Sequence, residues 1–142
     1  MNYFEVKVKY ERPGEEGRMQ KVAETYLTDT LTFADTEERV IEEIKPYLQG
    51  EMEVANIKKV RYAEVIDCED GDKWYKSKVV IVTFDEEHAK EKRTANQILV
   101  KGADINDALD RLTKELANWQ TETEIQGINE TLIMDVLRHK TE

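Results

Sequence analysis

Aromatic and basic side chains alternate along two stretches of the chain that the sequence pattern predicts as β-strands. Each stretch places one aromatic ring and two lysines on the same face: Tyr3, Lys7 and Lys9 in the first, and Trp74, Lys76 and Lys78 in the second. An open sheet that presents rings beside lysines binds single-stranded nucleic acid, because bases stack on the rings and phosphates contact the lysines. The alternative is that the rings pack at a sheet edge or a dimer contact, while the lysines keep the edges soluble. We favour this alternative because the chain is acidic and several of its strands are apolar on both faces.

The groups that carry covalent or metal chemistry are few and scattered. Cys68 lies at a predicted turn, His88 in a polar loop and His139 in the C-terminal tail, and none of these settings lowers a pKa or fixes a tautomer. The chain has no Cys/His cluster for zinc, and its six glycines form no phosphate-binding loop. We therefore expect no catalytic residues, no metal and no cofactor.

The acid-rich segment 67–72 raises the question of a calcium loop. The spacing does not fit, because Gly71 occupies the fifth position, where a side-chain oxygen is needed. An Asp-Gly pair between two strand-like runs is instead typical of a β-hairpin. The sequence therefore predicts a hairpin between a strand near Val54–Ile66 and a strand at Trp74–Phe84.

Two amphipathic helices position these groups, and they repeat each other. Apolar residues recur at three- and four-residue steps in both, as in a helix with one buried face. An offset of 72 superposes Ile105 on Phe33, Leu112 on Val40, Leu116 on Ile44 and Trp119 on Tyr47. The caps also match: Thr32 with Asp35, and Asp104 with Asp107, each combine an oxygen-bearing cap with an acid three residues later. Pro46 is expected to end the regular part of the first helix.

The strands around these helices repeat in the same order. Residues 24–27 superpose on 96–99 at the offset of 72, and residues 57–66 superpose on 128–137 at an offset of 71. Each half therefore reads strand, strand, helix, strand. We interpret the chain as a single domain of two duplicated halves, about 1–67 and 73–137, followed by a tail, 138–142, that is expected to fray.

The predicted fold class is α+β, with duplicated β-β-α-β units and two helices. In each unit the two strands that flank the helix are expected to run parallel. Either a ferredoxin-like sandwich with extra strands or a pseudo-twofold pair of smaller sheets fits this order. The run Val79–Val82 is apolar on both faces, which is typical of strands covered on both sides. Because two helices cover only one face, part of the other must be covered by the twin half or by a second copy of the protein, and we predict a homodimer that forms through the sheet.

Composition limits the classes of function. The chain has 142 residues, of which 39% are hydrophobic and 37% charged, and its formal net charge is −10. Such a composition favours a soluble globular protein, and no apolar run is long enough to cross a bilayer. Its single cysteine, Cys68, fits a reducing cytoplasm, and no signal segment precedes the first strand. The acidic balance argues against indiscriminate binding to phosphate backbones.

Four segments of the chain are distinctive: Tyr3–Tyr10, Ile41–Tyr47, Asp72–Val79 and Ile133–Val136. Together they resemble an uncharacterised family, a domain of unknown function found in Bacteroidota and their crAss-like phages. The resemblance covers nearly the whole chain and carries no established catalytic residues. It implies a small cytoplasmic protein of a bacterium or its phage. A phage setting would favour a role in replication or in countering host defence.

Three functional hypotheses follow from the sequence. The leading one is a non-enzymatic binding or assembly module, dimeric, whose partner is a protein or a small molecule. The second is a single-stranded nucleic-acid-binding protein that uses the aromatic and basic residues named above. The third is an enzyme, which would require a deep pocket that gathers carboxylates of perturbed pKa. No membrane partner is expected.

Overall fold

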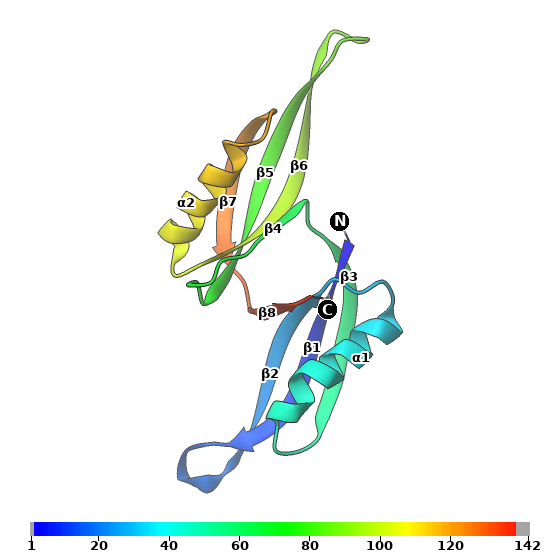
Figure 1. The fold of residues 1–142 in the computed structure, drawn as a ribbon, viewed down its shortest axis with the longest axis vertical. Coiled ribbons are helices and arrows are strands. Elements are labelled where there is room, and N and C mark those ends of the chain that lie inside the picture. Colours follow the sequence, from blue (N-terminus) through cyan, green and yellow to red (C-terminus); the bar gives the residue numbers. More distant parts are fainter. Residues whose placement is uncertain (1, 139–142) are drawn as a thin grey trace. The chain divides into compact units, whose positions relative to one another are not determined.

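The computed structural model describes residues 2–138, which form two α-helices and eight β-strands (Figure 1). The first half contains β1 (Asn2–Pro13), β2 (Met19–Thr28), α1 (Phe33–Ile44), β3 (Met52–Arg61) and β4 (Glu64–Ile66), with short 3-10 turns at Glu15–Gly17 and Lys45–Tyr47. The second half contains β5 (Lys73–Asp85), β6 (Lys90–Gly102), α2 (Ile105–Leu116), β7 (Glu122–Glu130) and β8 (Ile133–Leu137). The predicted α+β class with two helices is confirmed. His139 and most of the predicted tail lie outside the described residues.

The strands form two separate four-stranded sheets, each with its own helix. One sheet has the order β3-β1-β2-β8 and carries α1, and the other has the order β4-β6-β5-β7 and carries α2. In both sheets the two strands that flank the helix are antiparallel to the strand between them, and they are therefore parallel to each other, as predicted. The pair of smaller sheets is the arrangement found, and the single ferredoxin-like sandwich is not. We call the sheet with α1 the first unit and the sheet with α2 the second unit.

The last strand of each half belongs to the sheet of the other half. β4 pairs in parallel with β6, and β8 pairs in parallel with β2. The compact units are accordingly residues 2–61 with 132–138, and residues 62–131, so they do not coincide with the two halves of the sequence. The predicted hairpin at 67–72 is wrong for the same reason: β4 does not pair with β5, because β6 lies between them. The Asp-Gly pair lies in the connection between β4 and β5, and β4 pairs instead with the buried segment Ile98–Val100 of β6.

The registers of the two sheets demonstrate the duplication residue by residue. Phe4 lies opposite Thr28 in the first sheet and Tyr75 opposite Val100 in the second, which are the same positions at offsets of 71 (4 + 71 = 75) and 72 (28 + 72 = 100). A bulge interrupts the pairing of β1 with β3 after Lys7, and a bulge interrupts the pairing of β5 with β7 after Lys78. The two positions are again 71 residues apart. Bulges are specific devices that bend a strand. Their recurrence at equivalent positions supports a common origin.

The exchanged strands obey the same relation. Val65 of β4 lies opposite Leu99, and Val136 of β8 lies opposite Leu27, so both partners shift by the expected offsets (65 + 71 = 136; 27 + 72 = 99). All four side chains are buried. Each half therefore gives its last strand to the sheet of the other half, and the two exchanged strands pair in the same register. The exchange is a property of the repeated unit.

The helix caps form as the sequence predicts. The Asp35 backbone N–H donates to the Thr32 hydroxyl at 3.0 Å, and the Asp107 N–H donates to the Asp104 carboxylate at 2.8 Å. These bonds satisfy amide groups that have no partner inside the first helical turn. α1 ends at Ile44, and Pro46 lies in the 3-10 turn that follows.

Each helix packs on one face of its own sheet. The core of the second unit is formed by Tyr75, Val79, Ile98, Val100, Ala108, Leu112 and Leu116, and the core of the first unit by Val6, Val8, Tyr26, Val40 and Leu137. Five apolar positions of the helical periodicity are more exposed than it implies. Phe33 and Ile105 begin α1 and α2, Tyr47 lies in the 3-10 turn after α1, and Ile41 and Leu109, within the helices, are each 37% exposed. Phe33 is 55% exposed, Ile105 is 45% exposed and Tyr47 is 86% exposed.

The junction between β2 and α1 contains a buried chain of hydroxyl groups. The Thr28 and Thr30 hydroxyls lie 2.7 Å apart, the Thr30 and Thr36 hydroxyls lie 2.5 Å apart, and Thr36 donates to the Thr32 carbonyl at 2.8 Å. Thr28, Thr30 and Thr36 are buried, so each polar group needs its neighbour.

The second unit has no hydroxyl groups at the equivalent positions. An offset of 72 places Val100, Gly102 and Ala108 where the first unit has the three threonines. A Cβ atom on Gly102 would lie only 2.8 Å from the Ala108 nitrogen. The strand and helix therefore approach closely here, and glycine is required for steric reasons.

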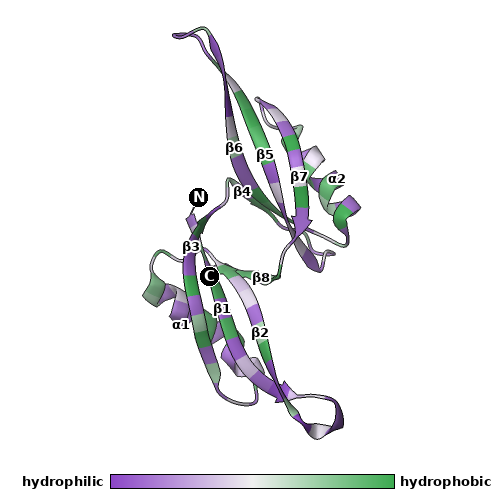
Figure 2. Cartoon of the chain, turned by 180° about the vertical axis from the view of Figure 1, so that it is seen from behind, coloured by the Kyte–Doolittle hydropathy of each residue, from purple (hydrophilic) through white to green (hydrophobic). Residues whose placement is uncertain are grey.

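Near the β5–β6 turn, the face of β5 that turns away from α2 is also apolar. Val79 points toward the helix, whereas Val80 and Val82 point away from it, and all three are buried. In Figure 2 β5 is green over much of its length. The prediction that this strand is covered on both sides is confirmed.

Candidate functional site

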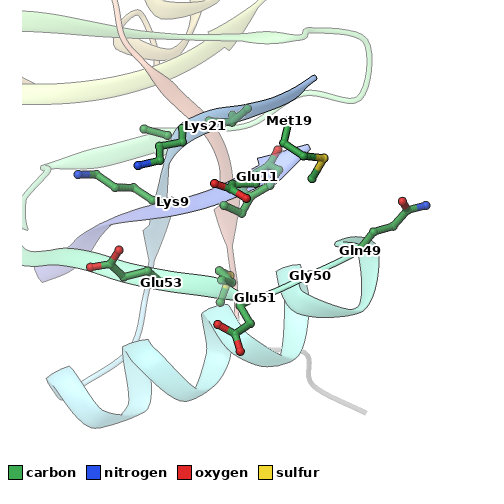
Figure 3. A pocket seen from close by; sticks show the side chains of 12 residues that line it. Lys9, Glu11, Met19, Lys21, Gln49, Gly50, Glu51 and Glu53 are labelled. Carbon is green, nitrogen blue, oxygen red and sulfur yellow. The ribbon is translucent and has the colours of Figure 1, made fainter. Parts of the chain in front are cut away.

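An open cleft of about 780 Å³ lies in the first unit, where the β1–β2 hairpin extends beyond α1 (Figure 3). The last part of β1 and the first part of β2 form one side, and residues 49–53, which include the beginning of β3, form the other. A volume of this size is in the range of small-molecule and peptide sites.

Four charged side chains of the cleft share the face of the sheet that turns away from α1. Lys9 and Glu11 lie on β1, with Lys21 opposite Glu11 on β2 and Glu53 opposite Lys9 on β3. In Figure 3 the Lys9 and Lys21 side chains extend toward the same side, and Glu53 approaches that side from β3. Among the described residues, none of the four is within 4.0 Å of an oppositely charged group. The cleft thus presents two amines and two carboxylates on this face that are not paired with each other, and Glu51 adds a third carboxylate to its lining.

The second unit closes the equivalent surface. Val80 and Val82 occupy the positions of Lys9 and Glu11 (9 + 71 = 80; 11 + 71 = 82). Arg93 and Glu124 occupy the positions of Lys21 and Glu53 (21 + 72 = 93; 53 + 71 = 124), and they form an ion pair across β5. This pair crosses the face on which the two valines are buried.

A tyrosine–glutamate–tyrosine cluster lies beneath the cleft on the helix side of the sheet. The Tyr10 hydroxyl donates to one oxygen of Glu24, and the Tyr26 hydroxyl donates to the other oxygen at 3.4 Å. The hydrogen bond to Glu24, with some burial, raises the pKa of Tyr10, and burial with the nearby carboxylate raises the pKa of Tyr26. Both phenols are therefore protonated at neutral pH and act as donors. The second unit has isoleucine and asparagine at these positions, namely Ile81, Asn96 and Ile98.

The two aromatic rings of the nucleic-acid hypothesis are not on open surfaces. Tyr3 is 6% exposed, and Trp74 is fully buried. The Lys101 ammonium lies 5.6 Å from the centre of the Trp74 ring, a cation–π contact. The Trp74 indole N–H has no hydrogen-bond partner among the described residues. In this structure neither ring offers a face on which a base could stack.

The four lysines of the same hypothesis are exposed. Lys7 and Lys9 lie on the helix-free face of the first sheet, and Lys76 and Lys78 lie on the helix-free face of the second. No ion pair holds any of them within residues 2–138. Of the six predicted site residues, only Lys9 lines the cleft.

The cysteine and the described histidine take part in local turn structure. The Cys68 thiol lies 3.5 Å from the Lys101 carbonyl oxygen. His88 Nδ1 lies 2.9 Å from Asp85 in the β5–β6 turn, and Glu87 brings a third possible metal ligand within 4.8 Å. Asp85 also accepts from the backbone N–H groups of Glu87 and His88, which is ordinary turn geometry.

Sequence reasoning did not identify Lys21, Glu53 or the two methionines of the cleft, Met19 and Met52. Alternating charges on a strand normally indicate a solvated face, so these residues gave no distinct signal. The usable signal was the repeat. When the two halves are superposed, Lys9 and Glu11 of the first copy occupy the positions of Val80 and Val82 in the second copy.

The chain belongs to the family described as a domain of unknown function, DUF4494, whose model matches residues 2–139. A comparison with curated proteins found no match. Neither helix in residues 2–138 has the length and apolar character needed to span a membrane.

Proposed function

We propose that the chain is a non-enzymatic binding module, and that its ligand occupies the cleft at the hairpin end of the first unit. One observation carries the proposal. The two units share one architecture, yet only the second closes this surface with an ion pair over valines. The first unit keeps four separated charges at the same positions.

The charges of the cleft indicate the class of ligand. Lys9 and Lys21 would bind an anionic group, and Glu11 and Glu53 a cationic group. Met52 and the ring of Tyr10 add apolar surface to the cleft from the helix side of the sheet. A ligand with both charges and a short apolar stem fits this combination, as in a free amino acid or a peptide segment of a protein partner.

A binding screen with a closed variant tests the proposal. The library consists of free amino acids and short peptides of mixed charge, and the readout is the amide correlation NMR spectrum of the full chain. The closed variant copies the second unit into the first: Lys9→Val, Glu11→Val and Lys21→Arg, with Glu53 retained. We expect ligand-dependent shifts at residues 9–23 and 49–53 in the natural chain and none in the closed variant.

A matched control removes charges from the other unit. The variant Lys76→Ala with Lys78→Ala should bind the same ligands as the natural chain. The proposal fails if no library member shifts the cleft residues, or if the closed variant binds equally well.

A single-stranded nucleic acid is the second candidate, and the exposed lysines favour it. Lys7, Lys9, Lys76 and Lys78 are free to contact phosphates, whereas the buried rings of Tyr3 and Trp74 argue against stacking. Titration with a fluorescent thymidine oligonucleotide at low and at high salt separates the candidates, because phosphate contacts strengthen at low salt. Binding at low salt that is lost when all four lysines are replaced would support a nucleic-acid ligand.

A cytoplasmic setting in a bacterium or its phage accompanies this proposal. It rests on the resemblance of the four distinctive segments and on the single cysteine, which suits a reducing compartment.

A further inference from the structure

Two long strands end their sheets with an unpaired outer edge. β3 pairs only with β1, and β7 pairs only with β5, among the strands of the described chain. The two strands are equivalents in the repeat. An open edge of nine or ten residues presents a row of backbone N–H and C=O groups that can add another strand.

The two edges carry opposite charge. β3 contains Lys58, Lys59 and Arg61 with one acid, Glu53, which gives a net charge of +2 (3 − 1). β7 contains three glutamates and no basic residue, which gives −3. A basic edge is unusual in a chain whose net charge is −10.

These charges also decide which edges can meet. Two β3 edges would repel each other, and so would two β7 edges, because like charges directly opposite destabilise a strand pair. Only β3 against β7 is attractive. Within one chain the two strands stand at the ends of different sheets and do not pair.

In one antiparallel register two basic residues of β3 lie opposite glutamates of β7, while Glu53 and Glu130 face each other at the far end, since 53 + 130 equals 183. With Arg61 opposite Glu122, Lys59 lies opposite Glu124, since 61 + 122 and 59 + 124 both equal 183. Arg61, Lys59 and Glu122 form no ion pair among the described residues, whereas Glu124 is already paired with Arg93 and would be shared between Arg93 and Lys59. Arg61 and Glu122 are therefore free to bind each other.

We propose that the chain binds a second copy of itself by pairing the basic edge of β3 in one copy with the acidic edge of β7 in the other. The contact is heterologous, because different surfaces of the two copies meet. The charged pairs of this contact lie at the Arg61 end of β3, whereas Met52 and Glu53 at the other end of the strand line the cleft. The edge variants therefore leave the cleft residues unchanged, so failure of self-association and failure of ligand binding are measured separately.

Charge reversal tests the contact by sedimentation velocity over a range of protein concentrations, at low and at high salt. The natural chain should associate with increasing concentration, and salt should weaken the association. Arg61→Glu alone and Glu122→Lys alone should each reduce association at least several-fold. The double variant Arg61→Glu with Glu122→Lys should recover it, and so should an equimolar mixture of the two single variants.

Reversals away from the edges are the matched controls. Lys7→Glu on β1 and Glu37→Lys on α1 change the net charge by the same amounts and should leave association unchanged, and circular dichroism should confirm that every variant is folded. A chain that stays monomeric at low salt overturns the proposal. So does association that ignores the edge variants, or that responds to Lys7→Glu, which would indicate contact through the sheet face.

Discussion

Arg93 on β6 reaches across β5 to Glu124 on β7, and this ion pair crosses the face that holds Val80 and Val82. The corresponding lysine and glutamate of the first unit, Lys21 and Glu53, do not meet. After duplication the two copies therefore kept their strands and registers but diverged at one end of the sheet.

A double-mutant cycle on Arg93 and Glu124 should yield a small coupling energy. Both side chains are about half exposed, at 46% and 52%, so solvent screens their attraction. We expect a coupling of at most about 1 kcal/mol. Urea unfolding of Arg93→Ala, Glu124→Ala and the double variant measures it. A coupling several times larger would mean that the pair is a main support of the second unit.

Replacing Gly102 by alanine should destabilise the chain. The new Cβ would lie 2.8 Å from the Ala108 nitrogen and 3.0 Å from its Cα, and backbone atoms cannot move aside cheaply. Overpacking of this kind costs about 1–3 kcal/mol. Gly127→Ala is the control, because nothing lies within 4 Å of its Cβ position. Equal unfolding midpoints for the two variants would contradict the predicted close approach of strand and helix.

The threonine chain should respond non-additively to substitution. Thr36→Val removes one hydroxyl from a buried chain and should cost about 1–3 kcal/mol, because Thr30 loses one of its two hydroxyl partners and keeps only Thr28. The triple variant Thr28→Val, Thr30→Gly, Thr36→Ala adopts the residues of the second unit at these positions. It should cost less than the sum of its single changes, since no hydroxyl is then left unsatisfied. Thermal or urea unfolding of the natural chain, the three single variants and the triple variant measures the difference, and strict additivity would argue against a coupled chain.

The cluster of Tyr10, Glu24 and Tyr26 should make stability decline at alkaline pH. In the folded chain the raised pKa values keep both phenols protonated, whereas the unfolded chain releases these protons near pH 10. The unfolded state then binds fewer protons than the folded state, so the free energy of unfolding falls as pH rises above about 10. Urea unfolding at a series of alkaline pH values follows this loss.

The variant Glu24→Gln separates the causes of the two shifts. The pKa of Tyr10 should fall back toward its ordinary value, because its hydrogen bond to the carboxylate is the main cause. The pKa of Tyr26 should stay raised to a greater extent, since burial is its main cause. Ultraviolet titration of the tyrosinates, with Tyr10→Phe for assignment, tests this. An unchanged titration of Tyr10 would contradict the assignment.

The sequence predicted local structure well where periodicity and caps agreed. Thr32 and Asp104 mark the beginnings of both helices, and the offset between Val40 and Leu112 identified equivalent core positions. The duplication and the two-sided apolar character of Val79–Val82 also followed from pattern alone.

Strand partners could not be predicted in the same way. Val65 and Val136 occupy equivalent short strands, and either would fit against either sheet, because Leu27 and Leu99 offer the same apolar edge. The pattern of apolar residues in a short strand therefore does not predict which of the two sheets the strand joins. The cleft was hidden for a related reason, since Lys21 and Lys9 come together only through cross-strand register.

The exchange of β4 and β8 also makes the two repeats structurally dependent on each other. A protein made of one repeat, such as residues 1–67, would carry a terminal strand with no sheet of its own to join, and a sheet that lacks its fourth strand. Two such molecules would complete each other by trading these strands. In the present chain each half supplies the strand that completes the sheet of the other half, so neither half has a complete sheet by itself.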